Sequence, residues 1–452
     1  MQSQKQKYDV IVIGGGASGM MAAGRAGERG KSVLLIEKNA GVGKKLDITG
    51  GGRCNITNAE YDKHAFLKNY GEAQQFLYSP LSVFGVQDTF DFFTKRGLPL
   101  VVEARKRAFP ETQKATDVTK VLKKYIADNK VEILTKVTVH ELRAEKGRVV
   151  EAVTSRGLPV PARALHAGER GTQTGTYSAD KFIVATGGVS HPETGSTGDG
   201  FKWLNALGHT VNPATPTIVP IKVRESWVKA QPGVTLANMK ITFFGDGKKA
   251  FSKKGPLLFT HFGLSGPTIL NCAGAVGQLL SEGDVNATID MFPDMDFAEL
   301  EKNLLSVIDT NKNKDFKNVL EKIVPDGRPQ ANQQISWLGL PPLPAGLARA
   351  VLGLLALPQP DIKSHSVTKE ERKRLVHILK AAPLTITGLM GVDRAVISDG
   401  GVPLAEVDTR AMRSLIVKNL YLTGDVLHIN RPSGGYSLQM CWTTGYVAGN
   451  NV

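Results

Sequence analysis

The sequence predicts an α/β protein whose main domain, built on a parallel sheet, is interrupted by an inserted domain. Two observations carry this prediction. An apolar, β-branched run over residues 8–13 leads directly into a glycine-rich turn and a helical pattern, as expected of a buried parallel strand followed by a crossover helix. Two later segments, 181–188 and 419–425, repeat the change from apolar strand to glycine turn, so the end of the chain returns to the first sheet.

We predict that residues 1–195 and 385–452 form the two segments of the main domain, and that residues 196–384 form the insert. Strand-like and helix-like patterns divide the insert into β-rich parts at about 196–262 and 360–384 and a helical part at about 265–357. A polar stretch at 161–178 is expected to be a surface loop of the main domain.

Composition bounds the function. With 41% hydrophobic and 22% charged residues among 452, the chain is globular rather than disordered or fibrous. The net charge of +14 favours a polyanionic partner, such as nucleic acid or a phosphorylated cofactor. The three cysteines, Cys54, Cys272 and Cys441, are far apart and show no paired spacing, so neither disulfides nor a metal site is expected. No long apolar stretch and no signal-peptide pattern are present, which predicts a cytoplasmic protein without a membrane span.

The first strand is followed by the pattern G-x-G-x-x-G at Gly14, Gly16 and Gly19. In this pattern the first glycine allows the tight turn, the second admits a pyrophosphate to the backbone, and the third lets the helix approach the strand. The N-terminus of the helix, at Ala17 and Ser18, offers free N–H groups and a partial positive charge to the phosphates. The order strand, glycines, helix and strand predicts a dinucleotide-binding site.

Glu37 ends the second strand, where its carboxylate can accept hydrogen bonds from both ribose hydroxyls. The same carboxylate would repel a 2′-phosphate, so FAD or NAD is expected rather than NADP. We also expect Lys38 and Lys45 to contact the cofactor. Arg53 is expected to bind the pyrophosphate or a phosphate of the substrate.

Two distant segments favour FAD. Thr186-Gly187 and Gly424-Asp425 each follow an apolar strand, and both resemble segments of flavoproteins of the glutathione-reductase type. The resemblance implies that Asp425 binds a ribityl hydroxyl of FAD and that the backbone near Val137 contacts the adenine. A turn or helix-capping role is the plainer alternative for Asp425.

Gly434 and Gly435 open the last predicted helix, directly before Tyr436. Free N–H groups at this N-terminus would stabilise an anionic reduced flavin at its N1/O2 edge. An ordinary glycine loop is the alternative.

The run Gly50-Gly51-Gly52-Arg53-Cys54-Asn55 is more specific. Together with 258–267 and the Gly-Gly-Tyr segment, it resembles the BaiN/RdsA family of FAD-dependent oxidoreductases, also labelled aminoacetone-oxidase-like, over almost the whole chain. The resemblance implies an FAD enzyme and places Gly51 and Gly52 near the cofactor. Two departures stand out. Asp425 replaces the family's glutamate, and the stretch after it loses two carboxylates and gains His428 and Arg431.

No residue stands out as the proton donor. His261, Cys54 and Tyr436 are weak candidates for acid–base work, and for each a structural or packing role is the simpler interpretation. The insert has no second G-x-G-x-x-G after a strand, so NAD(P)H, if it reduces the flavin, would bind transiently.

Three hypotheses remain open for the function. One branch of the family is associated with reduction of a uridine in large-subunit ribosomal RNA to dihydrouridine, which suits the basic charge. Other branches are linked to small molecules, either steroid-like enones or amines. For such a ligand the aromatic residues Trp203, Trp227, Phe262 and Trp337 are candidates to line a pocket, and a place in the hydrophobic core is the alternative. The third hypothesis is a flavin-bearing binding protein without turnover. The oligomeric state is not predicted.

Overall fold

The computed structural model describes residues 7–157, 172–316, 319–320, 345–356, 362–391, 395 and 397–452. Its contacts divide the chain into unit 1, Met1–Pro216 with Val392–Val452, and unit 2, Thr217–Gly391. Both boundaries fall later in the chain than the sequence suggested. The reason is that β10, Asn212–Thr217, pairs with β17, Ile397–Gly401, as the chain leaves unit 1 and returns to it.

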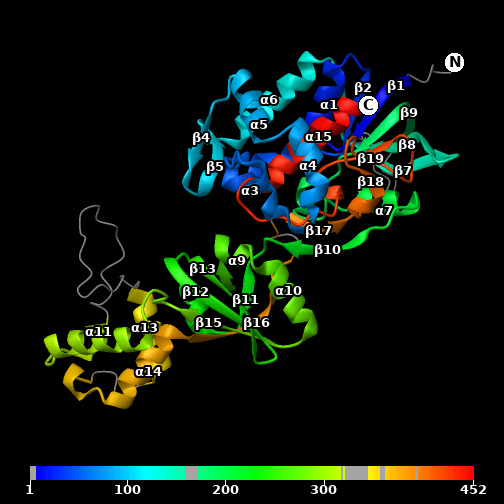
Figure 1. The fold of residues 1–452 in the computed structure, drawn as a ribbon. Helices are drawn as coiled ribbons and strands as arrows, with labels where there is room; N and C mark the ends of the chain where they lie inside the picture. The colour runs from blue at the N-terminus through cyan, green and yellow to red at the C-terminus, as the bar shows by residue number, and fades with distance from the viewer. Residues whose placement is uncertain are drawn as a thin grey trace, which may run out of the picture. The chain divides into compact units, whose positions relative to one another are not determined.

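Unit 1 is organised around a nine-stranded sheet whose main path runs β18-β19-β20-β9-β1-β2-β6 (Figure 1). Strands β20, β9, β1, β2 and β6 are parallel, which confirms the predicted α/β class. Strands β7 and β8 continue from β9 as an antiparallel meander. The bounds of the sheet are β1 Lys7–Ile13, β2 Val33–Glu37, β6 Glu132–Thr135, β7 Val137–Glu145, β8 Arg148–Gly157, β9 Thr172–Val184, β18 Val407–Asp408, β19 Arg413–Ser414 and β20 Leu420–Leu422.

The two ends of the chain meet through a pair of closely packed helices, α1 (Ala17–Glu28) and α15 (Tyr436–Asn451). Side chains on Gly445 and Gly449 of α15 would overlap the carbonyl oxygens of Ser18 and Ala22 on α1. Only glycine therefore lets α15 lie directly against α1, and this contact makes the C-terminal segment part of the first domain.

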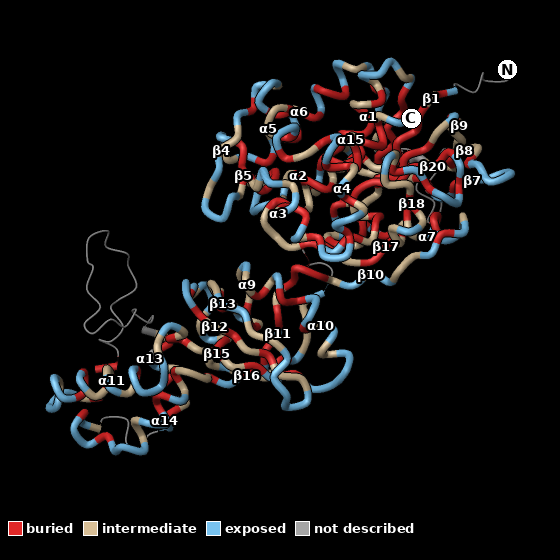
Figure 2. Tube along the Cα trace, viewed as in Figure 1, coloured by how far each residue is buried: buried red, intermediate tan, exposed pale blue. Residues whose placement is uncertain are grey.

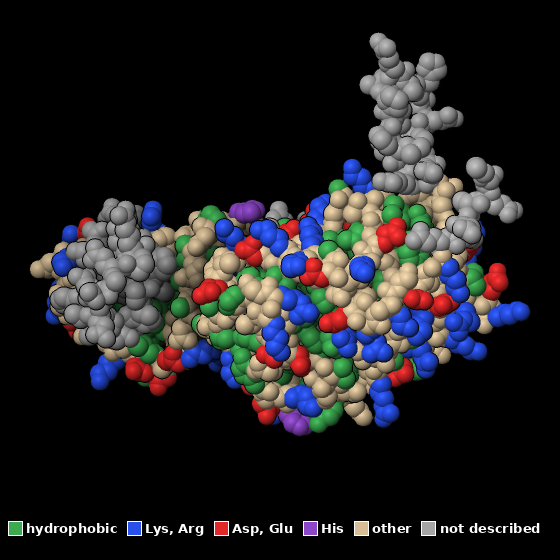
Figure 3. Space-filling model, turned by 90° about the horizontal axis from the view of Figure 1, so that it is seen from above, with side chains coloured by type: hydrophobic (Ala, Val, Ile, Leu, Met, Phe, Trp, Pro, Cys, Tyr) green, Lys and Arg blue, Asp and Glu red, His purple; other side chains and the backbone are tan. Residues whose placement is uncertain are grey.

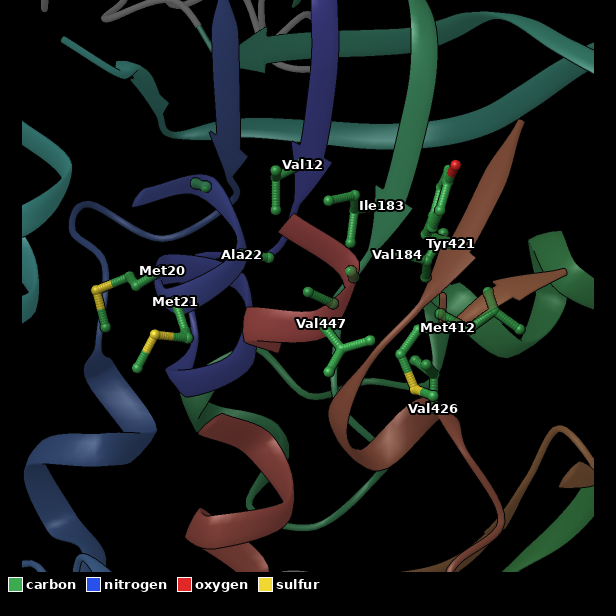
Figure 4. Close-up of a cluster of buried hydrophobic side chains, with 14 of the residues drawn as sticks. Val12, Met20, Met21, Ala22, Ile183, Val184, Met412, Tyr421, Val426 and Val447 are labelled. Carbon is green, nitrogen blue, oxygen red and sulfur yellow. The ribbon is translucent and has the colours of Figure 1, made fainter. Parts of the chain in front are cut away.

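The core of unit 1 lies between the sheet and these helices. Figure 4 shows Val12 of β1, Ile183 of β9 and Val447 of α15 around one buried cluster, and each is fully buried. The remaining elements are α2 Lys44–Ile48, β3 Thr57–Asn58, α3 Lys63–Leu67, α4 Gln74–Val83, α5 Val86–Lys95, β4 Leu100–Glu103, β5 Arg107–Pro110, α6 Ala115–Asp128 and α7 Asp199–Ala206, with short 3-10 turns between them.

Unit 2 is a closed antiparallel barrel with helices and a hydrophobic core of its own (Figure 2). The strand order is β11-β14-β13-β12-β15-β16. The bounds are β11 Ile221–Val223, α8 Ser226–Lys229, β12 Thr235–Gly245, β13 Lys248–Thr260, β14 Gly263–Ser265, α9 Pro267–Leu270, α10 Ala273–Glu282, β15 Val285–Asp290, α11 Phe297–Thr310, α13 Ala345–Leu355, α14 Lys369–Lys380 and β16 Ala382–Leu389.

Two local predictions are wrong. The part at 360–384 is not β-rich, because Thr368 and Glu371 form a capping box that starts helix α14. The described residues of the part at 265–357 are mainly helical, and the one strand within them, β15, alternates buried and less buried residues and pairs with β12 in the barrel. Residues 172–178 of the expected loop belong to β9 and pair with β8, while 158–171 lie outside the described residues.

Among the described residues, no helix combines the length and apolarity needed to cross a membrane. The three cysteines are free thiols, and Cys54 and Cys272 are buried.

Candidate functional site

The glycine loop between β1 and α1 has the geometry of a dinucleotide cradle. Gly14 has a φ of +104°, and a Cβ there would lie 2.5 Å from the carbonyl oxygen of Ala185. A Cβ on Gly19 would overlap the carbonyl oxygen of Gly14. By contrast, no atom lies within 4 Å of a Cβ built on Gly16, and no side chain caps the N-terminus of α1. The loop is therefore rigid where it meets the protein and open where phosphates would approach the helix N-terminus.

Glu37 lies buried at the end of β2, beside this loop. Its Oε2 accepts a hydrogen bond from the Gly15 N–H at 2.8 Å, and its Oε1 accepts two from Asn39, at 2.7 Å from the backbone and 2.8 Å from the side chain. A carboxylate has about four lone-pair sites, so these donors fix its orientation and leave capacity for a ribose hydroxyl.

The two predicted lysines have different surroundings. The Lys38 Nζ lies 2.8 Å from Asp199 Oδ2 and also donates to Thr197, so its charge is already compensated. The Lys45 Nζ donates to Ser190 Oγ at 3.1 Å. Burial lowers the pKa of Lys45, and the nearby Asp425 carboxylate opposes that shift. Lys45 is thus a largely desolvated cation whose charge an anionic ligand would compensate.

Two further residues expected to contact the cofactor lie at strand ends of unit 1: Val137 begins β7, and Thr186 follows β9. Val137 is buried at the start of β7, and the preceding Lys136 N–H donates to Asn39 O at 2.9 Å, beside the Glu37 carboxylate. The Thr186 Oγ1 is buried in the turn before Gly187 and has no hydrogen-bond partner among the described residues. Such an orphaned hydroxyl is costly unless a ligand satisfies it.

Asp425 is held by one of the residues that depart from the family pattern. Its carboxylate forms an ion pair with the Arg431 guanidinium, and both side chains are largely buried. Arg431 also donates to Ile429 O and, at 3.0 Å, to Ser437 Oγ. The hydroxyl of Thr423, two residues before Asp425, is a second buried group without a partner in the described part of the chain. The two departures, Asp425 and Arg431, therefore compensate each other electrically.

The N-terminus of α15 begins at Gly435, where a side chain would overlap the backbone of Thr57. The Asn58 amide donates to the carbonyl of Gly434 at 3.2 Å. Tyr436 packs against Phe66, with ring centroids 4.9 Å apart. Its ring therefore serves packing in unit 1.

In the Gly-Gly-Gly-Arg-Cys-Asn segment, two glycines are exposed, whereas the arginine is held by contacts within the protein. Gly51 and Gly52 are exposed, with no atom within 4 Å of a built Cβ. Arg53 donates to Gln113 at 2.6 Å, forms an ion pair with Glu103 and lies 4.1 Å over the ring of Phe109. These contacts occupy its guanidinium within the protein.

The remaining weak catalytic candidates are Cys54 and His261. Cys54 is fully buried, and burial raises the pKa of its thiol to about 12. His261 belongs to unit 2, exposed in the turn between β13 and β14. Of the aromatic residues expected in a pocket of the insert, Trp203 lies on α7 of unit 1, Trp227 packs against Phe259 in unit 2, and Trp337 lies outside the described residues.

The sequence analysis missed β17. Its Ser398 Oγ accepts a hydrogen bond from the Val189 N–H at 3.1 Å, so this strand touches the turn after Gly187. Asp399, the next residue, has a buried Oδ1 with no hydrogen-bond partner among the described residues. A usable signal was present, since Gly400-Gly401 repeats the change from apolar strand to glycine that marked the other segments.

These residues fit FAD. The open face at Gly16, the buried Lys45 cation and the orphaned hydroxyls of Thr186 and Thr423 are the features that a bound dinucleotide would complete. In the described part of the chain, no group of three or more His, Cys, Asp or Glu side chains is arranged to hold a metal ion.

The fold and the site define an FAD-dependent oxidoreductase with a Rossmann-type FAD domain. The chain belongs to the HI0933-like family, whose Rossmann-domain model matches residues 8–451. This confirms the resemblance to BaiN/RdsA-type flavoproteins.

Two curated relatives span nearly the whole chain. The 3-dehydro-bile acid delta(4,6)-reductase of Clostridium scindens is 29% identical and covers 97% of both chains. The ribosomal RNA dihydrouridine synthase of Escherichia coli is 26% identical and covers 99% of this chain and 98% of its own. Among solved structures, a 3-ketosteroid-Δ4-(5α)-dehydrogenase from Rhodococcus jostii shares the fold, with a TM-score of 0.53 at 14% identity, covering 100% of this chain and 98% of its own.

Proposed function

We propose that this protein reduces a carbon–carbon double bond conjugated to a carbonyl group, and that its substrate is a uridine of large-subunit ribosomal RNA, which becomes dihydrouridine. The names of the two relatives point to this reaction type, because a uracil ring and a 3-oxo-Δ4 steroid ring both carry a double bond beside a carbonyl. When bound, FAD supplies the hydride. NAD(P)H is the proposed donor, bound transiently.

The observation that most supports an RNA substrate is a set of lysines on unit 2 that have no acidic partner among the described residues. Lys248, Lys249 and Lys253 on the β12–β13 hairpin, here called the hairpin lysines, are exposed. None of them has an acidic partner among the described residues, whereas the neighbouring Lys254 pairs with Asp294. Uncompensated lysines on one strand are suited to an RNA backbone, because phosphate contacts supply most of the affinity for nucleic acid.

Other basic clusters of the chain, at 105–107, 120–124 and 372–374, are partly compensated. Lys106 pairs with Glu60, and Lys120 and Lys124 pair with Asp117 and Asp128. Arg372 and Arg374 donate to backbone carbonyls. Lys and Arg side chains are spread over the face drawn in Figure 3, with acidic side chains among them. Net charge alone therefore identifies no binding surface, and the hairpin lysines are the better indicator.

A small-molecule enone is the second candidate. It is favoured by the higher identity to the bile-acid reductase, 29% against 26%. A steroid-like substrate would bind through apolar burial and would not need the hairpin lysines.

The decisive experiment is nucleoside mass spectrometry of ribosomal RNA from cells with and without the gene. We expect dihydrouridine to disappear on deletion and to return on complementation. Unchanged dihydrouridine would refute the RNA substrate, and reduced FAD-loaded protein should then be challenged with cyclohex-2-enone and with 4-androstene-3,17-dione.

A binding experiment tests the hairpin lysines separately. Replacing all three with alanine should weaken binding of a ribosomal RNA fragment and flatten its salt dependence by about one unit of slope per lysine that contacts a phosphate. Lys95, Lys120 and Lys124, which are exposed but paired with Asp91, Asp117 and Asp128, provide a matched triple-alanine control. Equal losses of RNA affinity in both variants would mean that binding depends on the net charge of the protein and not on the hairpin lysines.

A further inference from the structure

Asp399 lies between the two segments expected to hold the flavin. On one side, the Oγ of its neighbour Ser398 receives a hydrogen bond from Val189, and a side chain on Gly188 would overlap that oxygen. On the other side, Val402 donates to Val426 O at 2.8 Å and accepts from the His428 N–H at 2.9 Å. Strand β17 therefore packs between the turn that follows Thr186 and the segment that follows Asp425.

The surroundings of the Asp399 carboxyl set it apart from ordinary buried carboxylates. Its Oδ1 is buried and receives no hydrogen bond from the described residues, whereas Glu37 accepts hydrogen bonds from Gly15 and Asn39 and Asp425 forms an ion pair. Burial raises the pKa of Asp399. A carboxyl group that no donor stabilises in its charged form is suited to carry a proton.

Among the described residues, three titratable side chains act on Asp399. Arg431 and His428 favour its charged form, and Asp425 opposes it. Arg431 is already engaged by the Asp425 carboxylate. His428 is half-buried, and its ring nitrogen Nδ1 contacts the side-chain amide of Asn212 on β10. Thus the two basic residues that depart from the family pattern both surround Asp399.

We infer that Asp399 is the proton donor of the reduction, with its carboxylic acid giving a proton to one carbon of the double bond. This inference rests on the proposed reductase function. The other carbon receives the hydride supplied by FAD, so the double bond gains one hydride and one proton and the substrate stays at its original charge. The Asp399 carboxylate left behind lies near Arg431, whose guanidinium favours the charged form of Asp399, and it regains a proton from water.

The first test does not depend on turnover. The visible absorption of bound, oxidised FAD is titrated between pH 4 and 9 in the wild type, in Asp399→Asn and in Asp399→Glu. We expect a pH-dependent band shift in the wild type, its loss in Asp399→Asn, and its retention with a displaced midpoint in Asp399→Glu. Asp180→Asn, at an exposed ion pair with Lys7, is the control and should titrate like the wild type. An identical titration in Asp399→Asn would overturn the inference by showing that no Asp399 ionisation reaches the flavin.

The second test is single-turnover oxidation of the reduced enzyme by a uridine-containing rRNA fragment or by cyclohex-2-enone. Loss of the general acid should slow this step about 10²–10⁴-fold in Asp399→Asn, with partial recovery in Asp399→Glu and no change in reduction of the flavin by the donor. A wild-type rate in Asp399→Asn overturns the inference while the reductase function stands. If the wild type itself oxidises with neither probe, the proposed function fails, and the donor role fails with it.

Discussion

The candidate FAD site has two halves, and they differ in what shapes them. The N-terminal half, from Gly14 to Glu37, is shaped by backbone: a glycine turn, an uncapped helix end and a carboxylate fixed by N–H groups. The C-terminal half, from β17 to Arg431, is shaped by side-chain charge, with a buried ion pair and an unpaired carboxyl side by side. The first half offers what any dinucleotide needs, whereas the second half has the groups that can differ between substrates.

The largest effect is expected at the ion pair of the C-terminal half. Arg431→Met should lower the free energy of unfolding of the FAD-free protein by about 3–5 kcal/mol, because it leaves the buried Asp425 charge uncompensated. The double variant Arg431→Met/Asp425→Asn should recover most of this loss. Urea denaturation of the wild type, Arg431→Met, Asp425→Asn and the double variant gives the coupling energy between the two side chains. Additive losses would mean that the two side chains do not stabilise each other.

The N-terminal half should respond to backbone crowding instead. A methyl group on Gly19 would overlap the Gly14 carbonyl, so Gly19→Ala should cost about 3 kcal/mol in the FAD-free protein. Gly16 faces open space, so Gly16→Ala should leave that stability within about 0.5 kcal/mol. FAD affinity, measured by flavin fluorescence quenching, should nevertheless fall in Gly16→Ala. Unchanged affinity would show that the phosphates do not approach the open face.

The same contrast explains what the sequence could predict. The glycine pattern at Gly14, Gly16 and Gly19 follows from steric rules that hold within one short segment, so it is readable in order along the chain. The partners of Asp425 and Asp399 come from segments whose meeting depends on the tertiary fold. No local pattern predicts that Arg431 pairs with Asp425, or that β17 packs between two turns that are far apart in the sequence. Likewise, the sequence predicts Arg53 as a phosphate ligand, but in the structure its guanidinium pairs with Glu103 and lies over the ring of Phe109.

The predicted lysines allow a comparison within the cradle. Burial lowers the pKa of Lys45 below 10.5, so between its folded pKa and 10.5 the unfolded chain binds more protons and stability rises with pH. At pH 7 the full penalty of the buried charge applies, so Lys45→Met should stabilise the FAD-free protein by about 1 kcal/mol. This gain should shrink as the pH approaches 10.5.

Lys38→Met is the matched control for that measurement, because Lys38 is paired with Asp199 and its removal should give no gain. Urea denaturation at pH 7 and pH 10 checks both variants. FAD affinity should fall in Lys45→Met, since a buried cation that destabilises the FAD-free protein is compensated by an anionic ligand. A gain in stability with unchanged affinity would remove Lys45 from the binding site.

The smallest effect is expected at an orphaned hydroxyl. Thr186→Val keeps the side-chain shape and removes a buried group that has no partner in the described part of the chain, so the FAD-free protein should be as stable as the wild type or slightly more so. If FAD satisfies this hydroxyl, its affinity should fall by about fivefold, which corresponds to roughly 1 kcal/mol for one hydrogen bond.

Thr89→Val separates the two causes. The Thr89 Oγ1 donates to Gln439 at 2.9 Å in a buried network, so its removal should lower stability by about 1–3 kcal/mol and leave FAD affinity unchanged. Opposite responses of the two threonines would show that the Thr186 hydroxyl is part of the binding site, because the hydrogen bond it lacks in the FAD-free protein is the one the cofactor provides. Equal loss of stability in both variants would mean that Thr186 is satisfied by the protein itself.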